Sequence, residues 1–332
     1  MHRLLLLISL LLVVAPACDR PARDAAPAGA EDETGPLAAH PPAAYERRML
    51  FLAGPEARPV VALFDFATLD DGAGLHRAAR AWRGEAGGWD SVLVAAWEDA
   101  PARAPWLIVP NGPFRLLVGD DGEVEALVYR GERSELRLVP APEFAAWSRG
   151  RGAQLRLRSA QLARDGARTP GTLLDVQLAR ELPRAPAPPG ATAASGPAAA
   201  PDSVAATATD AQPYDEAYVT DGEELHVVLT GAPDAGDVLW VIAGPEERVV
   251  EGARLEEGAA QGGRTRVRGP VWRIAAPDAA LEGELRAEGA PLELAAGDAV
   301  GPAPVALFVV RGWVELRGVR RAVYGLVRRG QG

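Results

Sequence analysis

The chain has 332 residues and a formal net charge of −10, and all 35 of its basic residues are arginine. An acidic chain lacks the positive field that neutralises phosphates, so nucleic acid is not an expected partner. The absence of lysine also excludes a phosphate loop of the Gly-Lys-Ser/Thr type and any Schiff-base lysine.

The first seventeen residues have the pattern of a secretory signal peptide. A basic start is followed by an apolar run at 4–14, interrupted by Ser9, and by Ala15-Pro16-Ala17, a small-residue cleavage pattern. The apolar run is too short to cross a bilayer as a helix, which takes about 20 residues. We therefore predict that residues 1–17 are removed.

Cys18, the only cysteine of the chain, comes directly after the predicted cut. This placement resembles the lipobox of bacterial lipoproteins, although Ala15 stands where that family prefers leucine. The resemblance implies that Cys18 carries acyl chains that anchor the protein in the cell envelope. Asp19 resembles an inner-membrane retention signal, so we expect the chain to face the periplasm, with the outer surface as the other location. Ordinary secretion and an uncleaved anchor are the alternatives to lipidation.

Two segments have too little apolar bulk to offset the entropy of ordering the chain. Residues 18–44 are predicted to form the lipidated cysteine and a flexible tether, and residues 183–213 a disordered Ala/Pro-rich linker. This leaves a first domain at 45–182 and a second at 214–332, both of ordinary domain size. A long loop inserted in a single domain is the alternative for 183–213. No short-period repeat is visible.

Alternation of apolar and polar residues in the first domain indicates half-buried strands at 135–140 and 154–162. Residues 114–131 predict a hairpin that turns at Asp121-Gly122, and Asp71-Gly72 and Asp165-Gly166 predict further turns. Pro142 and Gly150 are placed as helix start and stop signals, so a short helix is expected there. Residues 74–84 fit either a helix or a strand.

The second domain consists of short apolar or alternating runs separated by Gly or Pro, with a turn at Asp221-Gly222. Strands at intervals of about 8–12 residues are typical of sandwiches and barrels. The predicted fold class is mainly β, with two β-sandwich or β-barrel-like domains joined by the linker.

No catalytic or cofactor motif is present in the sequence. His76 and His226 are far apart and lack a second histidine or cysteine nearby, so no metal site is predicted. Asp65 lies in the apolar run Leu63-Phe64-Asp65-Phe66. Desolvation would raise the pKa of Asp65 if it faced a cavity; a satisfied polar group at a strand end is the alternative.

Tryptophan is the most suggestive residue type. Trp82, Trp89, Trp97 and Trp106 fall in one short stretch of the first domain. Tryptophan rings offer a large apolar area and one N–H donor, which suits an apolar or sugar-stacking pocket. We predict that these four residues, with Asp65, line a ligand-binding pocket. Ordinary core packing is the alternative.

One segment near the C-terminus carries a family resemblance. Gly312-Trp313-Val314-Glu315-Leu316-Arg317-Gly318 resembles the closing strand of the lipocalin-like family that includes hydroxyneurosporene synthase, a carotenoid hydratase. The resemblance implies a pair of β-barrel-like domains that enclose a lipid-sized ligand. It does not place the family's catalytic residues on this chain, and the long Ala/Pro linker departs from the family.

The sequence as a whole predicts an envelope lipoprotein that acts by binding and not by catalysis. The expected partners are the membrane, through Cys18, and an apolar small molecule, a glycan or another envelope protein. A lipocalin-like enzyme acting on a hydrophobic substrate and a purely structural envelope component are the alternatives.

Overall fold

A computed structural model describes residues 43–54, 59–85, 88–102, 105–118, 124–132, 134–149, 153–181, 216–231, 237–258, 269–294 and 305–330. All of them belong to one compact unit, Leu37–Gly332. Strands dominate these ranges, and the single helical element in them is the short 3₁₀ turn η1 (Pro277–Ala279). The predicted mainly-β fold is therefore confirmed. The predicted leader, the predicted linker and the predicted tether up to residue 42 lie outside the described residues, whereas Ala43 and Ala44, the last two residues of the predicted tether, belong to the first strand.

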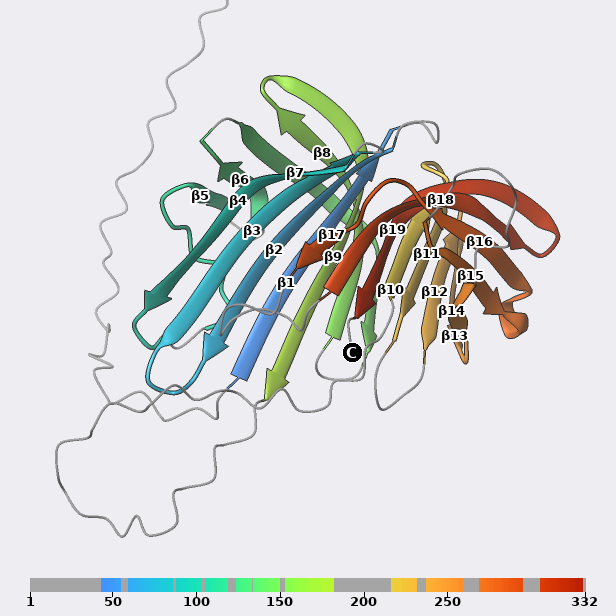
Figure 1. Cartoon of the computed structure of the whole chain (residues 1–332). Helices are drawn as coiled ribbons and strands as arrows, with labels where there is room; N and C mark the ends of the chain where they lie inside the picture. Colours follow the sequence, from blue (N-terminus) through green and yellow to red (C-terminus); the bar gives the residue numbers. More distant parts are fainter. Residues whose placement is uncertain are drawn as a thin grey trace, which may run out of the picture. The chain divides into compact units, whose positions relative to one another are not determined.

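The first sheet has nine antiparallel strands in the order β4-β3-β2-β1-β9-β8-β7-β6-β5 (Figure 1). Its first and last strands, β1 and β9, pair at the centre of the sheet. The strands are β1 (Ala43–Ala53), β2 (Val60–Asp70), β3 (Leu75–Glu85), β4 (Gly88–Asp99), β5 (Phe114–Val118), β6 (Val124–Arg130), β7 (Glu135–Arg149), β8 (Ala153–Arg164) and β9 (Ala167–Glu181).

The second sheet repeats this connectivity in the order β13-β12-β11-β10-β19-β18-β16-β15-β14, with β17 added beside β18. Its first and last strands, β10 and β19, again pair at the centre. The strands are β10 (Glu216–Thr220), β11 (Leu225–Thr230), β12 (Val238–Ala243), β13 (Glu246–Glu251), β14 (Arg254–Gly258), β15 (Val271–Ala276), β16 (Leu281–Ala287), β17 (Leu292–Leu294), β18 (Val305–Leu316) and β19 (Val319–Gly330).

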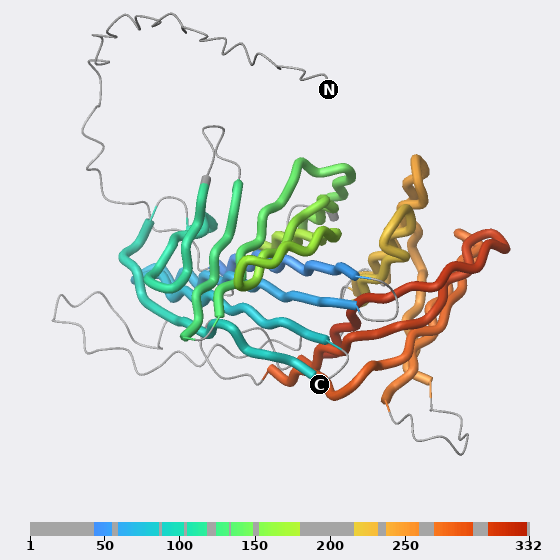
Figure 2. Tube along the Cα trace, turned by 90° about the horizontal axis from the view of Figure 1, so that it is seen from above, coloured from blue at the N-terminus to red at the C-terminus, as the bar shows by residue number. Residues whose placement is uncertain are grey.

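Each sheet is curled, so it has an inner and an outer face (Figure 2). Side chains alternate between the two faces along every strand. On β1, Met49 and Phe51 point into the core enclosed by the first sheet, whereas Leu50 and Leu52 belong to a core shared with the second sheet. The second sheet encloses a core of its own. Three apolar cores thus hold the described unit together.

The expected helix at 142–150 is wrong, because β7 runs through its described part as a strand. The pairing of β7 with β8 shifts between Pro140 and Glu143 and again between Glu143 and Ala145. Such bulges leave ladder positions unpaired, which tolerates Pro142 with its missing N–H. Residues 75–85 form a strand, β3. None of the described segments forms a helix suited to crossing a membrane.

The hairpin predicted at 114–131 is present as β5 and β6, and its turn lies outside the described residues. The turn between β8 and β9 falls on Asp165 and Gly166, which both have positive φ, at 48° and 90°. Two consecutive positive φ values are the geometry of a tight hairpin turn that follows the natural twist of the strands.

Candidate ligand-binding site

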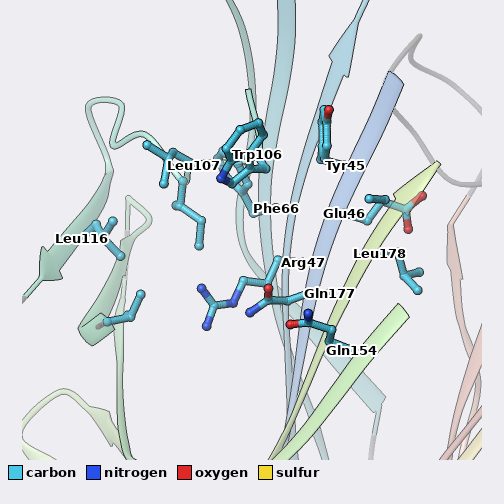
Figure 3. Close-up of a pocket in the computed structure, with 13 residues that line it drawn as sticks. Tyr45, Glu46, Arg47, Phe66, Trp106, Leu107, Leu116, Gln154, Gln177 and Leu178 are labelled. Carbon is cyan, nitrogen blue, oxygen red and sulfur yellow. The ribbon is translucent and has the colours of Figure 1, made fainter. Parts of the chain in front are cut away.

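A pocket of about 680 Å³ opens on the inner face of the first sheet (Figure 3). This volume is within the range of small-molecule sites, about 300–1,000 Å³. The residues that line the pocket come from several strands and from the loop between β4 and β5. They are Tyr45, Glu46, Arg47, Phe66, Trp106, Leu107, Ile108, Leu116, Val124, Gln154, Gln177, Leu178 and Ala179.

A polar row crosses the sheet at one side of the pocket. Arg47 on β1 lies opposite Gln177 on β9, and Gln177 lies opposite Gln154 on β8. Opposite residues of an antiparallel ladder share a face, and neighbouring strands are about 4.8 Å apart. The guanidinium and the two carboxamides therefore lie side by side, as Figure 3 shows.

A buried ion pair fixes the charged end of this row. Arg47 donates from Nε and Nη2 to the two carboxylate oxygens of Asp175, at 2.9 and 2.6 Å. The Asp175 side chain is only 1% exposed. Two parallel N–H···O bonds hold both planes in one geometry, and the same carboxylate lies 3.9 Å from Arg158 Nε.

Aromatic rings form the other side of the pocket. Tyr45 and Trp106 lie with their ring centroids 6.1 Å apart and tilted by 56°, and Phe66 is a further lining residue. Trp106 and Leu107 remain 57% and 56% exposed. Large apolar side chains that stay exposed beside a pocket are typical of a ligand entrance.

Arg77 holds the loop that carries Trp106 and Leu107. Its Nη1 donates to the Leu107 carbonyl at 2.8 Å and to Thr68 Oγ1 at 3.2 Å, and its Nε lies 2.7 Å from an Asp99 carboxylate oxygen. Burial lowers the pKa of Arg77, and the Asp99 carboxylate opposes that shift. The buried guanidinium thereby ties the loop to β2 and to the end of β4.

The described residues of the second sheet enclose an apolar core on the corresponding face. Its enclosed core is filled by apolar side chains, including Trp272 and Phe308, whose rings lie 5.0 Å apart. On its central pair, Ala217 and Val327 lie opposite each other in that core. Burying ions and amides costs free energy unless partners satisfy them. The polar row of the first sheet is therefore not a requirement of the fold.

The four predicted tryptophans do not lie together. Trp106 lines the pocket, and Trp97 packs beside it, with its ring 6.2 Å from that of Phe66 and its Nε1 donating to Asp99 at 3.2 Å. Trp82 and Trp89 pack in the core that the two sheets share. Ligand binding by these residues stays a prediction, and the geometry favours Trp106.

Asp65 also lies away from the pocket, on the outer face of β2. In the ladder it is opposite Arg48 and Arg80, and its carboxylate is 3.6 Å from Arg80 Nη1. Arg48 reaches across to Glu216 of the second sheet at 2.8 Å. Burial raises the pKa of Asp65 to about 6, against the lowering effect of Arg48 and Arg80.

The two histidines lie apart as well. His76 Nε2 is 3.1 Å from Asp71 near a turn of the first sheet. His226 is buried on β11, and that burial lowers its pKa to about 4. Among the described residues, no three His, Cys, Asp or Glu side chains are grouped so that they could hold a metal ion.

Arg47, Gln154 and Gln177 were not among the predicted site residues. The alternation at 154–162 does place Gln154, Arg156 and Arg158 on one face, but such a face is usually solvated. The sign of this site in the sequence is limited to two glutamines, Gln154 and Gln177, each of which lies among apolar residues in a segment that forms a strand. The pairing of β8 with β9 and of β9 with β1 is needed to bring them together.

No protein-family model and no curated protein matches this sequence. Among solved structures, kievitone hydratase from Nectria haematococca is similar, with a TM-score of 0.55 and 11% identity over 89% of this chain and 90% of that one. An AttH-type protein from Nitrosomonas europaea is similar, with a TM-score of 0.53 and 12% identity over 92% of this chain and 98% of that one. The chain therefore shares the fold of these two proteins, the lipocalin-like architecture that the C-terminal resemblance implied.

Proposed function

We propose that this chain is a binding module for a small molecule that has an apolar body and a polar head, and that the pocket of the first sheet is its site. The observation that carries the proposal is the polar row of Arg47, Gln177 and Gln154 in a pocket that is otherwise apolar and aromatic. In the part of the second sheet that the structure describes, the equivalent core consists of apolar side chains.

Replacing the tryptophan at the entrance tests this proposal. Trp106→Ala removes a ring that lines the pocket, and we expect it to weaken binding of the neutral apolar dye Nile red by about tenfold, since an aromatic anchor contributes on the order of 1–3 kcal/mol. The measurement is a fluorescence titration of the purified chain. Trp313→Ala is the matched control, because Trp313 lies in the second sheet. Equal affinities of both variants and the parent would refute the site.

The module is, in the same proposal, held at a bilayer by acyl chains on Cys18. The support is the sequence of the first eighteen residues alone. More than one acyl chain is needed for stable anchoring, and bacterial lipoproteins carry such chains on the cysteine. We expect Cys18→Ser to release the protein into the soluble fraction after cell breakage. A variant that still sediments with membranes would show that another segment anchors the chain.

A second candidate is an enzyme of lipocalin-like type that acts on a hydrophobic substrate. The observation that favours it is the shared fold with kievitone hydratase over most of the chain. The Glu46 carboxylate faces away from the pocket, on the outer side of β1, where Arg48 Nη2 donates to it at 3.4 Å. Mass spectrometry of a compound recovered after incubation separates the candidates, since a binding module returns the compound unchanged and an enzyme of hydratase type adds one water.

A further inference from the structure

We infer that the loop at the mouth of the pocket docks on a lipid bilayer, so that the pocket opens toward the membrane. The docking surface is the described part of the connection between β4 and β5, residues 105–113, here called the entrance loop. The docking itself goes beyond the proposed binding function and does not depend on it. Its consequence for the exchange of a ligand does rest on that function.

The entrance loop has an unusual composition for a surface loop. The sequence contains no charged residue from Ala104 to Phe114, whereas 24% of the whole chain is charged. Loops that face water are usually polar, because Asn, Asp, Ser and Gly make their turns. Here the run Trp106-Leu107-Ile108-Val109 is continuously apolar. The loop is therefore suited to leave water at low cost in free energy.

The apolar side chains of this loop are held in an exposed position. Trp106 and Leu107 are 57% and 56% exposed, and the Leu107 carbonyl is fixed by Arg77 Nη1 at 2.8 Å. Asn111 and Phe114 exchange two backbone hydrogen bonds, of 3.0 and 2.9 Å, which close the end of the loop. An apolar surface that the fold holds outward is typical of an interaction site.

The position at which the chain enters the fold favours a bilayer as the partner. Tyr45 is the third residue of β1, and its ring lies 6.1 Å from that of Trp106, as Figure 3 shows at the pocket. The residues before Ala43 lead back to Cys18, the proposed site of the acyl chains. A flexible chain of about 25 residues spans roughly 30 Å. An anchor at Cys18 thus keeps the entrance loop within reach of the same membrane.

The chemistry of the loop matches the interfacial region of a bilayer. Tryptophan is enriched at membrane–water interfaces, where its apolar ring and its N–H donor both find partners. Backbone groups that enter lipid without a hydrogen-bond partner cost several kcal/mol each. Pro105, Pro110 and Pro113 have no N–H group, which removes part of that cost. Without a charge of its own, the loop binds lipid through its apolar area.

Docking at this loop gives a ligand a direct route between lipid and pocket. Trp106, Leu107 and Ile108 belong to the entrance loop and also line the pocket. When the loop lies in the interface, an apolar body passes along these side chains without crossing bulk water. The transfer therefore avoids the free-energy cost of exposing apolar area to water.

A dye attached to the entrance loop tests the docking. The chain from residue 18 onward with Cys18→Ser has neither the leader nor a site for acyl chains, and Pro110→Cys then supplies its single thiol for the dye NBD. Pro110 is exposed and is not among the residues that line the pocket. With phosphatidylcholine vesicles we expect NBD emission to rise about twofold and to shift to the blue, because the dye leaves water. Vesicles with nitroxide-labelled acyl chains should quench it.

The control for this measurement is the same dye at Val319→Cys. Val319 lies in the second sheet and is 57% exposed, so its dye should not respond to either kind of vesicle. A response at Pro110→Cys alone shows that the entrance loop, and not the surface in general, enters the bilayer.

A charge placed in the loop gives an independent arm. Val109 is not among the residues that line the pocket, and Val109→Asp should weaken sedimentation with phosphatidylcholine vesicles about tenfold, because a carboxylate resists leaving water. Val319→Asp makes the same change at an exposed position of the second sheet and should have no effect. Nile red binding without vesicles shows that both variants are folded. Salt at about 0.5 M should not weaken the docking, since screening acts on charges.

The outcomes separate this inference from the proposed function. A dye at Pro110→Cys that stays in water beside vesicles would overturn the docking, and the loop would then be a surface for a protein and not for lipid. Equal weakening by Val109→Asp and Val319→Asp, or loss of docking in salt, would overturn it as well. None of these results touches the pocket, because Nile red is titrated without vesicles. Docking by a parent chain that does not bind Nile red would overturn the proposed function and leave the docking in place.

Discussion

The sequence correctly indicates that the Asp65 carboxylate is desolvated, but it does not show where in the fold that carboxylate lies. The apolar neighbours in the sequence predict desolvation, and burial does raise the pKa of Asp65 to about 6. The carboxylate, however, lies between the two sheets and not in the pocket. Arg48, Glu46, Arg80 and Arg328 provide the charges around it.

This raised pKa makes stability depend on pH. A folded pKa of about 6 against an ordinary value of 3.8 means that the contribution of Asp65 is fully present below about pH 4 and is lost as the pH rises through about 6. The loss is up to about 3 kcal/mol, at about 1.4 kcal/mol per pKa unit. We expect Asp65→Asn to remove this part of the pH dependence. Urea unfolding of both chains from pH 4.5 to 7.5 measures it.

The lowered pKa of His226 changes the stability with pH in the opposite direction, so the comparison between variants has to allow for it. Its folded pKa of about 4, lowered by burial from 6.5, means that its contribution is lost as the pH falls from about 6.5 to about 4. The quantity to compare is therefore the difference between Asp65→Asn and the parent at each pH, because His226 is present in both. A difference that stays constant across the range would contradict the raised pKa of Asp65.

At the scale of the strand, an irregularity in β4 explains why the spacing of the tryptophans in the sequence did not predict which of them lie together. Trp89 and Trp97 are an even number of residues apart, so an unbroken strand would put them on one face. The pairing with β3 shifts between Ala81 and Trp82, so that Leu93 faces Ala81 and Ser91 faces Trp82. The extra residue reverses the faces. Trp89 thus joins the shared core and Trp97 the inner one.

Strands and tight turns were otherwise well predicted, because alternation and Asp-Gly pairs are local signals. Leu155 and Leu157 face one core, as the alternation indicated, and the turn at Asp165-Gly166 is present. The helix expected near 142–150 failed because Pro142 and Gly150 imitate helix boundaries. The bulges that accommodate Pro142 in β7 depend on the neighbouring strand β8, which a local reading does not include.

The polar row depends on pairing between residues that are far apart in the sequence, whereas alternation and Asp-Gly turns are local signals. Arg47 and Gln177 are opposite each other only because the first and last strands of the sheet pair at its centre. Their sequence separation exceeds the reach of periodicity or turn rules. The composition of the row was visible in the sequence, but its assembly was not.

At the scale of the whole described unit, the two sheets repeat one strand connectivity but enclose different side chains. The inner face of a sheet needs only apolar side chains of suitable total volume, so two copies can diverge until no repeat is visible. The outer faces are constrained by each other. Leu52 and Trp82 of the first sheet share a buried core with Tyr218 and Trp240 of the second, and Trp147 lies 6.3 Å from Trp240.

Because of this shared core, we expect the two sheets to unfold as one cooperative unit. Separating them would expose an apolar face on each sheet and break the ion pair between Arg48 and Glu216. Ile274→Val tests this, since Ile274 is 1% exposed in the second sheet's own core. The substitution should cost about 1 kcal/mol.

Hydrogen exchange of the native protein is the measurement that checks cooperativity. The slowest amides report global unfolding, so Ile274→Val should speed their exchange about fivefold in β1 and β9 as well as in β15. Val319→Ala, at a position that is 57% exposed, controls for a conservative change without core loss. If only the second sheet's amides exchange faster, the shared core does not couple the sheets, and each sheet unfolds on its own.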